Sequence, residues 1–347
     1  MIPDPEKLKN KGVQFLATGN HYSYAAVNLA TGLDQLGIPV KGTLGYHSPV
    51  HSDFIFRQDV VDPDVALRII DIVDGGFDYK NPFETDYSRD DTAILNMTDD
   101  ADAFLYYGDL RVFRAHSTLD LVYPYHYEPI GFGISDFLRK LASLSLGKPN
   151  RNPVFIRNFR GGMNQGIRQV LDASLLPLLD VFHNVAKGEN IRETRPAEYF
   201  DSLSNALGCL VYGGNFMHKL DERDLMLKAG LAPDNAQQLL DCKYKKEVVV
   251  IRWDSIQFWD SLATGCLPIH LDFRKYGFHL PKMPTSWEHY IGVDLDNIQG
   301  TIERMEAEWN RLPEIAQAGK EWALEHYTPI PTAKRFLEKM ECPLDSP

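Results

Sequence analysis

The stretch that most constrains the fold is residues 252–272, which read Arg-Trp-Asp-Ser-Ile-Gln-Phe-Trp-Asp-Ser-Leu-Ala-Thr-Gly-Cys-Leu-Pro-Ile-His-Leu-Asp. Phe258 and Leu262 are four residues apart, about one turn of a helix, and Trp259 and Ala263 have the same spacing. A helix over residues 255–264 would therefore carry one wide apolar face. Such a face has to pack against a larger apolar surface.

The two ends of this helix indicate what that surface is. Asp254 or Ser255 can cap the first N–H groups of the helix, and Gly265 can adopt the left-handed conformation that ends it. Residues 266–271 are then a short apolar run, typical of a strand buried on both faces of a parallel sheet. The stretch predicts a helix packed on a sheet, and so an α/β fold.

The beginning of the chain has the same character. Residues 13–19 are an apolar strand, 20–24 a loop, 25–36 an amphipathic helix and 39–44 a second strand. This order is the βαβ opening of a doubly wound sheet, in which ligands bind at the carboxyl ends of the strands. The loop contains no GxGxxG motif, so a dinucleotide is not indicated. Further on we expect helices at 64–74 and 134–146 and strands at 92–97, 103–107 and 122–127.

Residues 147–153 hold two prolines and a glycine without any other apolar side chain, which is typical of a domain boundary. After them the chain repeats its opening, with a strand at 154–156, a glycine-containing loop at 157–162 and a helix at 167–186. Two such units predict two Rossmann-like domains that face each other across a cleft. We place them at residues 1–147 and 153–330, followed by a C-terminal helix within 331–347. The remaining expected elements are helices at 196–206, 296–308, 313–326 and 331–340, strands at 207–212 and 247–251, and a segment at 221–241 to which we give no role.

Composition narrows the classes of partner. The 347 residues carry a formal net charge of −12, which opposes non-specific attraction to nucleic acid or to an anionic membrane. No segment has the roughly 18 consecutive apolar residues of a membrane span. The four cysteines, which show no CxxC spacing, are Cys209, Cys242, Cys266 and Cys342. This usage is typical of proteins in a reducing cytoplasm, so we expect a cytoplasmic protein.

The stretch at 252–272 also resembles a known family. A capped helix with an acidic residue near its middle, then Ala-x-Gly-Cys-x-Pro-Ile and a strand, is similar to the nucleotide-sugar-binding part of exostosin-like and related GT-B glycosyltransferases. Leu280-Pro281, Trp287 and residues 291–293 match elements downstream of it in that family. The resemblance is specific over residues 199–293. A long segment before Arg252 departs from the family pattern.

This resemblance implies a GT-B architecture and a function. The second domain would hold a nucleoside-diphosphate sugar donor, and the first an acceptor such as a saccharide or small molecule. No cofactor and no metal would be required if arginines and a helix N-terminus carry the leaving diphosphate. The last helix would cross back to the first domain, where Phe336 and Leu337 would pack.

The expected donor-binding residues lie in three places. Ser255 begins the helix whose N-terminal N–H groups attract phosphate, and Arg252 flanks it; an ordinary helix-flanking charge is the alternative for Arg252. Asp260 stands where related enzymes carry an acidic residue implicated in ribose binding, with a solvated outer face as the alternative. Arg157 and Arg160 follow the first strand of the second domain, where GT-B enzymes often place a diphosphate-binding cation; either could be a surface arginine. Lys243, Lys245 and Lys246 are interpreted as a solvated charge run.

His21 is the candidate catalytic base. It lies in the loop after the first strand, where some GT-B enzymes place a catalytic histidine, and its reference pKa near 6.5 suits proton transfer at neutral pH. An exposed loop histidine is the alternative. Three acidic residues are left open as alternative bases: Asp100, Asp109 and Glu128. A loop that contains His47, His51 and Asp53 does not have the spacing of a known set of metal ligands, so we interpret it as a surface loop.

These observations predict a metal-independent glycosyltransferase. A non-catalytic nucleotide- or sugar-binding protein of the same fold is the main alternative. A glycosyltransferase that modifies nucleic acid ranks lower because of the acidic charge. An NAD-dependent dehydrogenase is opposed by the missing GxGxxG.

Overall fold

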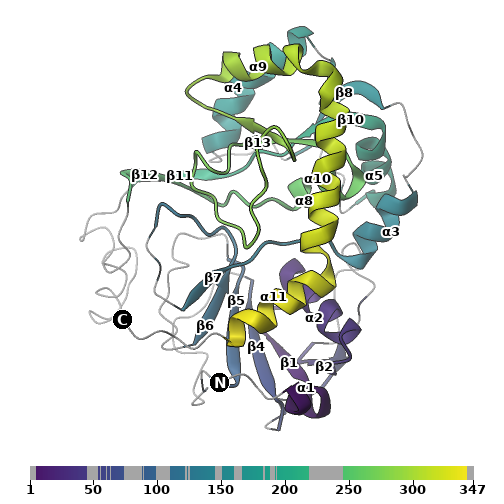
Figure 1. Ribbon diagram of the computed structural model, residues 1–347, viewed down its shortest axis with the longest axis vertical. Helices are drawn as coiled ribbons and strands as arrows, with labels where there is room; N and C mark the ends of the chain where they lie inside the picture. Colours follow the sequence, from purple (N-terminus) through teal and green to yellow (C-terminus); the bar gives the residue numbers. More distant parts are fainter. Residues whose placement is uncertain are drawn as a thin grey trace.

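The structure, a computed structural model, is described for residues 5–44, 54, 56–59, 61–62, 64–73, 88, 90–98, 110–121, 123, 126–144, 151–159, 166–182, 184–187, 192, 194–218 and 245–341. We call residues 5–144 the first half and 151–341 the second half. Each half contains a parallel β-sheet with helices packed on it (Figure 1).

The described residues of the first half form a seven-stranded sheet in the order β3-β2-β1-β4-β5-β6-β7, and all of its pairings are parallel. The order changes direction between β1 and β4, which makes the carboxyl ends of these two strands a switch point of the kind that binds ligands. The elements are α1 (Pro5–Lys11), β1 (Val13–Ala17), α2 (Tyr24–Gln35), β2 (Val40–Gly42), β3 (Arg57–Gln58), β4 (Leu67–Ile72), β5 (Thr92–Asn96), β6 (Arg111–Arg114), β7 (Tyr127–Pro129) and α3 (Asp136–Leu144).

In the second half, the described residues form a five-stranded parallel sheet in the order β14-β13-β10-β8-β9, with its switch point between β8 and β10. Its elements are β8 (Asn152–Arg157), α4 (Gly166–Phe182), β9 (Asn184–Lys187), α5 (Pro196–Asn205), β10 (Ala206–Leu210), β11 (Asn215–His218), β12 (Val248–Ile251), α8 (Ile256–Thr264), β13 (Leu267–Leu271), β14 (Ile291–Val293), α9 (Ile298–Ala307), the 3₁₀ turn η2 (Trp309–Arg311), α10 (Leu312–Tyr327) and α11 (Pro329–Glu341). The order of the two sheets confirms the predicted α/β class.

The helix, glycine turn and strand predicted at 255–271 are confirmed as α8, Gly265 and β13. Gly265 ends α8 with φ 70°, and every residue of β13 is buried. Ser255 occupies the N-cap position, but its side chain makes no capping hydrogen bond. On the packed face, the rings of Trp259 and Tyr327 lie 4.5 Å apart, which joins α8 to α10.

The last two helices connect the halves. In Figure 1, α10 runs along the second half and α11 continues over the first, where it packs against α2. Phe336 is buried in the core of the first half, 4.5 Å from the ring of Phe113, and Leu337 packs against the same core. Gly32 allows α2 to approach α11 closely, because a Cβ there would lie 2.0 Å from the carbonyl oxygen of Pro329.

One predicted helix is wrong, and two other predicted elements are present with different bounds or pairing. Within the helix predicted at 64–74, residues Leu67–Ile72 instead form the central strand β4, because their apolar run, rich in isoleucine, is buried on both faces of the sheet. The helix predicted at 167–186 ends at Phe182, and β9 follows it. The strand predicted at 247–251 does not join the main sheet; as β12 it pairs antiparallel with β11, which was not predicted.

Other predictions fall wholly or partly outside the described residues. The segments at 103–107 and 221–241 lie entirely outside the described residues, and most of the predicted linker also lies outside them. The strand predicted at 122–127 is described only in part, and β7 begins at Tyr127. Across the part of the chain that the structure describes, no helix has both the length and the apolar character needed to cross a membrane.

Candidate functional site

At the switch point of the first sheet, Asp71 on β4 holds the loop that follows β1. The Ser23 backbone N–H and hydroxyl donate to the two Asp71 carboxylate oxygens at 2.6 and 2.7 Å, and the Thr18 hydroxyl donates to the Asp71 carbonyl oxygen at 2.9 Å. Ser23 Oγ also accepts from Ala26 N and so caps α2. Asp71 is fully buried, and burial raises its pKa to about 7 against the opposing effect of the Ser23 hydrogen bonds. Asp71 therefore holds both ends of the loop in place, at Thr18 and at Ser23.

His21 lies within this loop and is partly exposed. Its Nδ1 is 2.7 Å from Asn20 Oδ1. A carboxamide oxygen only accepts hydrogen bonds, so this contact places the imidazole proton on Nδ1 and leaves the Nε2 lone pair for a proton. The geometry is compatible with a general base.

At the switch point of the second sheet, Arg157 forms an ion pair with a carboxylate. Its Nε lies 3.2 Å from both carboxylate oxygens of Asp172 on α4, and the Tyr212 hydroxyl donates to Asp172 at 3.0 Å. The hydrogen bond to Asp172 raises the pKa of Arg157. The guanidinium also lies over the Phe159 ring. Much of the charge of Arg157 is thus compensated within the protein, and Arg160 lies outside the described residues.

Arg168 is a cation at this switch point that the sequence analysis missed. It comes from the first turn of α4, and its Nε donates to the Tyr212 carbonyl oxygen at 3.3 Å. Its Nη2 would lie 3.8 Å from a Cβ built on Gly213, in the glycine loop after β10. The signal in the sequence was its position just after the glycine-containing loop, at the start of a helix.

The turn into α8 meets the end of β6 from the other half. The Asp254 backbone N–H donates to His116 Nδ1 at 3.0 Å, and an Asp254 carboxylate oxygen accepts from Phe132 N at 3.2 Å. His116 and Arg252 have φ of 55° and 56°, a conformation that is uncommon for residues with a side chain. Burial raises the pKa of Asp254 to about 6. His116 was not among the predicted site residues, and Asp254 was predicted only as a possible cap of α8.

Asp260 is fully buried rather than on a solvated outer face. It accepts from Arg192 Nε at 2.5 Å and from the Tyr199 hydroxyl at 3.1 Å. Arg192 Nη1 also donates to the hydroxyl of Tyr24, the first residue of α2, at 3.1 Å. The cavity at this junction, lined by Tyr24, Arg192 and Ile256 among others, holds only about 10 Å³. A ligand would reach Asp260 only if Arg192 moved.

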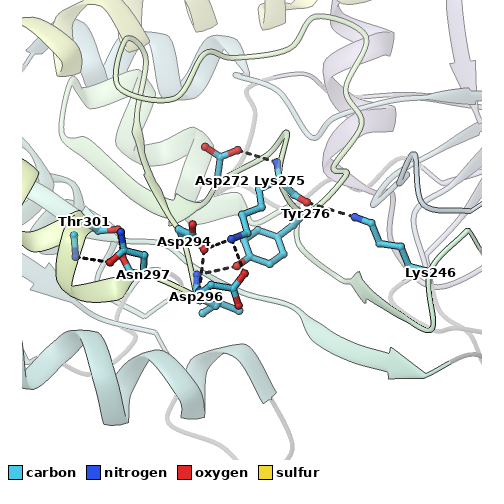
Figure 2. Close-up of polar contacts among 10 residues, drawn as sticks. Lys246, Asp272, Lys275, Tyr276, Asp294, Asp296, Asn297 and Thr301 are labelled. Atoms are coloured by element: carbon cyan, nitrogen blue, oxygen red, sulfur yellow. Dashed lines mark hydrogen bonds and ion pairs between the residues drawn. The ribbon is translucent and has the colours of Figure 1, made fainter.

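A larger cavity, of about 460 Å³, lies at the carboxyl ends of β13 and β14. Beside it the Lys275 ammonium lies 2.6 Å from Asp296 and also pairs with Asp294, and these carboxylates raise its pKa (Figure 2). None of the predicted donor-binding residues that the structure describes lines this cavity. Its lining includes Asp272, Arg274, Ser286, Asp294, Asn297 and Arg304.

The remaining candidates are placed as follows. Glu128 pairs with Lys339 at 3.0 Å. Lys245 and Lys246 are exposed, as expected for a solvated charge run, and Lys246 also pairs with Asp120 at 2.8 Å. Among the described residues, no group of three or more His, Cys, Asp or Glu could hold a metal ion. The candidates outside the described residues are His47, His51, Asp53, Asp100, Asp109 and Lys243.

No family model and no curated protein matches the sequence. Solved structures do match the fold. One is an α-glucosyltransferase in complex with UDP and a 13-mer DNA containing a HMU base, with a TM-score of 0.54 and 10% identity over 95% of this chain and 99% of that one. Another is an α-glucosyltransferase in complex with UDP-glucose and DNA containing an abasic site, with a TM-score of 0.52, 9% identity and the same coverage. The chain thus has a GT-B fold of two Rossmann-like domains.

Proposed function

We propose that this protein is a glycosyltransferase that moves a sugar from a nucleoside-diphosphate sugar to a hydroxyl group of an acceptor. The observation that carries the proposal is the similarity in fold over 95% of the chain to an α-glucosyltransferase whose structure contains UDP. The residues at the two switch points supply the chemical groups that such a reaction needs. A closer relation to exostosin-like enzymes is part of the proposal and rests on residues 199–293.

The donor diphosphate is assigned to the switch point of the second sheet. Arg168 brings a guanidinium to the Gly213–Gly214 loop. Ser255 opens α8 without using its side chain as a cap, and Arg252 precedes it. Cations and helix N–H groups stabilise the charge that develops on a leaving diphosphate. These groups would do so without a metal ion.

His21 is assigned as the base at the first sheet. As the acceptor oxygen bonds to the anomeric carbon, its proton passes to His21 Nε2 and the bond to the nucleoside diphosphate breaks. Asp71 keeps the loop in place through Ser23. We assign Asp260 an indirect role, because its carboxylate orients Arg192 toward Tyr24 at the junction.

A second candidate concerns the acceptor. Both similar structures contain DNA, one of them with a HMU base. A hydroxyl group on a nucleic-acid base is therefore proposed beside a saccharide or small molecule. The net charge of −12 argues against non-specific attraction to DNA, so such binding would have to be local.

A thermal-shift panel of UDP, GDP, ADP, CMP, dTDP and NAD tests the donor assignment. A ligand at about 100 times its dissociation constant stabilises the folded protein by roughly 2.7 kcal/mol, which raises the midpoint by several degrees. We expect one nucleoside diphosphate to produce this shift. A shift with NAD alone would favour the dehydrogenase. Nucleotide binding without turnover of any of the corresponding sugar donors would favour the non-catalytic alternative.

A further inference from the structure

A third cavity, of about 300 Å³, lies where α11 crosses from the second half to the first. Phe113 on β6 and Ile130 after β7 contribute apolar side chains from the first half. Pro281 and Lys282 contribute from the loop after β13, and α11 closes the cavity with Phe336. None of the residues assigned to the donor or to the base lines it. Its volume is at the lower end of the range for small-molecule sites.

Two polar side chains that line this cavity, one buried and one half-buried, lack a hydrogen-bond or ion-pair partner among the described residues. The Thr332 side chain lines it, is only 5% exposed, and its hydroxyl has no hydrogen-bond partner. Arg335 has no carboxylate within ion-pair distance among the described residues; its guanidinium lies 5.0 Å from the centre of the Tyr327 ring. Burial lowers the pKa of Arg335, because the charged form is poorly solvated there. Buried polar groups without partners are uncommon, and a bound ligand is one explanation.

The sequence of α11 places these groups on one face. Thr332, Arg335, Phe336 and Lys339 follow the spacing of residues that share a helix face, and all four line the cavity. This face presents a hydroxyl, a guanidinium, an aromatic ring and an ammonium side by side. Two carboxylates, Glu128 and Glu338, also line the cavity. Glu128 is paired with Lys339, and Glu338 favours the charged form of Arg335 from beyond ion-pair distance, which leaves Arg335 and Lys282 as the cations that can meet a ligand.

We propose that this cavity binds a small organic anion, with one phosphate or carboxylate group attached to a flat apolar ring. The anionic group would accept hydrogen bonds from Arg335 and Thr332, since guanidinium groups pair well with both kinds of anion. The ring would pack between Phe336 and Ile130. Because both halves line the cavity, such a ligand would contact both at once.

Isothermal titration of the full chain with phenyl phosphate, benzoate and inorganic phosphate tests this proposal. We expect saturable binding of at least one aryl anion at concentrations up to roughly 10 mM, and weaker binding of inorganic phosphate. The tighter of the two aryl anions identifies the preferred anionic group. Arg335→Met should weaken binding about tenfold or more, and Thr332→Val should weaken it several-fold, because each removes a hydrogen bond to a charged group. Arg139→Met, an exposed change on α3, is the matched control and should have no effect.

The thermal midpoint of each variant is measured beside the titration. We expect Arg335→Met to keep or raise the midpoint, because the half-buried guanidinium has no carboxylate within ion-pair distance among the described residues. The proposal is overturned if neither aryl anion binds the wild-type protein, if Arg335→Met binds as tightly, or if saturating UDP displaces the aryl anion. Displacement by UDP would place the anion at the donor site and leave the proposed function intact.

Discussion

Arg192 and Asp260 form an ion pair in which Nε lies 2.5 Å from Oδ2 and Nη2 lies 3.2 Å from Oδ1. Asp260 is fully buried and Arg192 almost so. Although burial opposes the charge on Arg192, the neighbouring carboxylate raises its pKa overall. Since Arg192 also donates to Tyr24, the pair links α8 to the first half.

Asp260→Asn should destabilise the protein strongly. It would leave the Arg192 charge buried without a counter-charge, and removing one member of a buried pair commonly costs about 3–5 kcal/mol. Urea unfolding at neutral pH measures the change. Asp34→Asn, an exposed substitution near the end of α2, is the control and should change the free energy of unfolding by less than about 0.5 kcal/mol. Equal stabilities of the Asp260 variant and the control would contradict this account of the pair.

Asp71 should make the stability depend on pH. In the unfolded chain it titrates near about 3.9, whereas the folded protein has a pKa of about 7 at this residue. Between these values the folded protein holds a proton that the unfolded chain has lost. The contribution of Asp71 to the free energy of unfolding therefore falls as the pH rises from about 4 to about 7, by on the order of 4 kcal/mol, and is level above that.

Asp71→Asn removes this titration and tests it. The free energy of unfolding of the wild type minus that of the variant should be larger at pH 5 than at pH 8. Taking the difference cancels other groups that titrate in this window, such as Asp254. A difference that does not change with pH would show that Asp71 has an ordinary pKa in the folded protein.

Gly32→Ala should separate α2 from α11. The new Cβ would lie 2.0 Å from the Pro329 carbonyl oxygen and 2.8 Å from the Ala333 Cβ, so at least one helix has to move. Overpacking of this kind costs about 1–3 kcal/mol, which should lower the midpoint of thermal unfolding by a few degrees. Asp34→Ala on the same helix is the control. An unchanged midpoint in the Gly32 variant would mean that α11 does not pack this closely in solution.

Local sequence signals predicted α8, Gly265 and β13 because helical spacing, a turn glycine and an apolar run agree there. The same reasoning failed for β4, since a short apolar run fits a buried helix as well as a central strand. β11 was missed because a strand in a two-stranded ribbon has little apolar patterning of its own. Whether such a segment becomes a strand depends on the strand beside which it pairs, and the spacing of apolar residues in the sequence does not specify that partner.

The candidate site was predictable only in part. The loop of His21 could be placed from the βαβ pattern, as could the start of α8 at Ser255. The partners of the buried acids could not, because Asp71 meets Ser23 across 48 residues and Asp260 meets Arg192 across 68. Such pairs depend on strand order and on how the two halves meet.

The rate of sugar transfer tests the central claim most directly. It is measured as nucleoside diphosphate released from UDP-glucose, or from the sugar donor of whichever nucleotide binds, with saccharide or hydroxymethylated DNA acceptors. The account predicts transfer by the wild-type protein, a loss of about 100-fold or more in His21→Ala with donor affinity unchanged, and donor affinity about tenfold weaker in Arg168→Ala. Wild-type transfer by His21→Ala would remove that residue as the base. Failure of every nucleotide-sugar donor to be consumed would contradict the assignment as a glycosyltransferase.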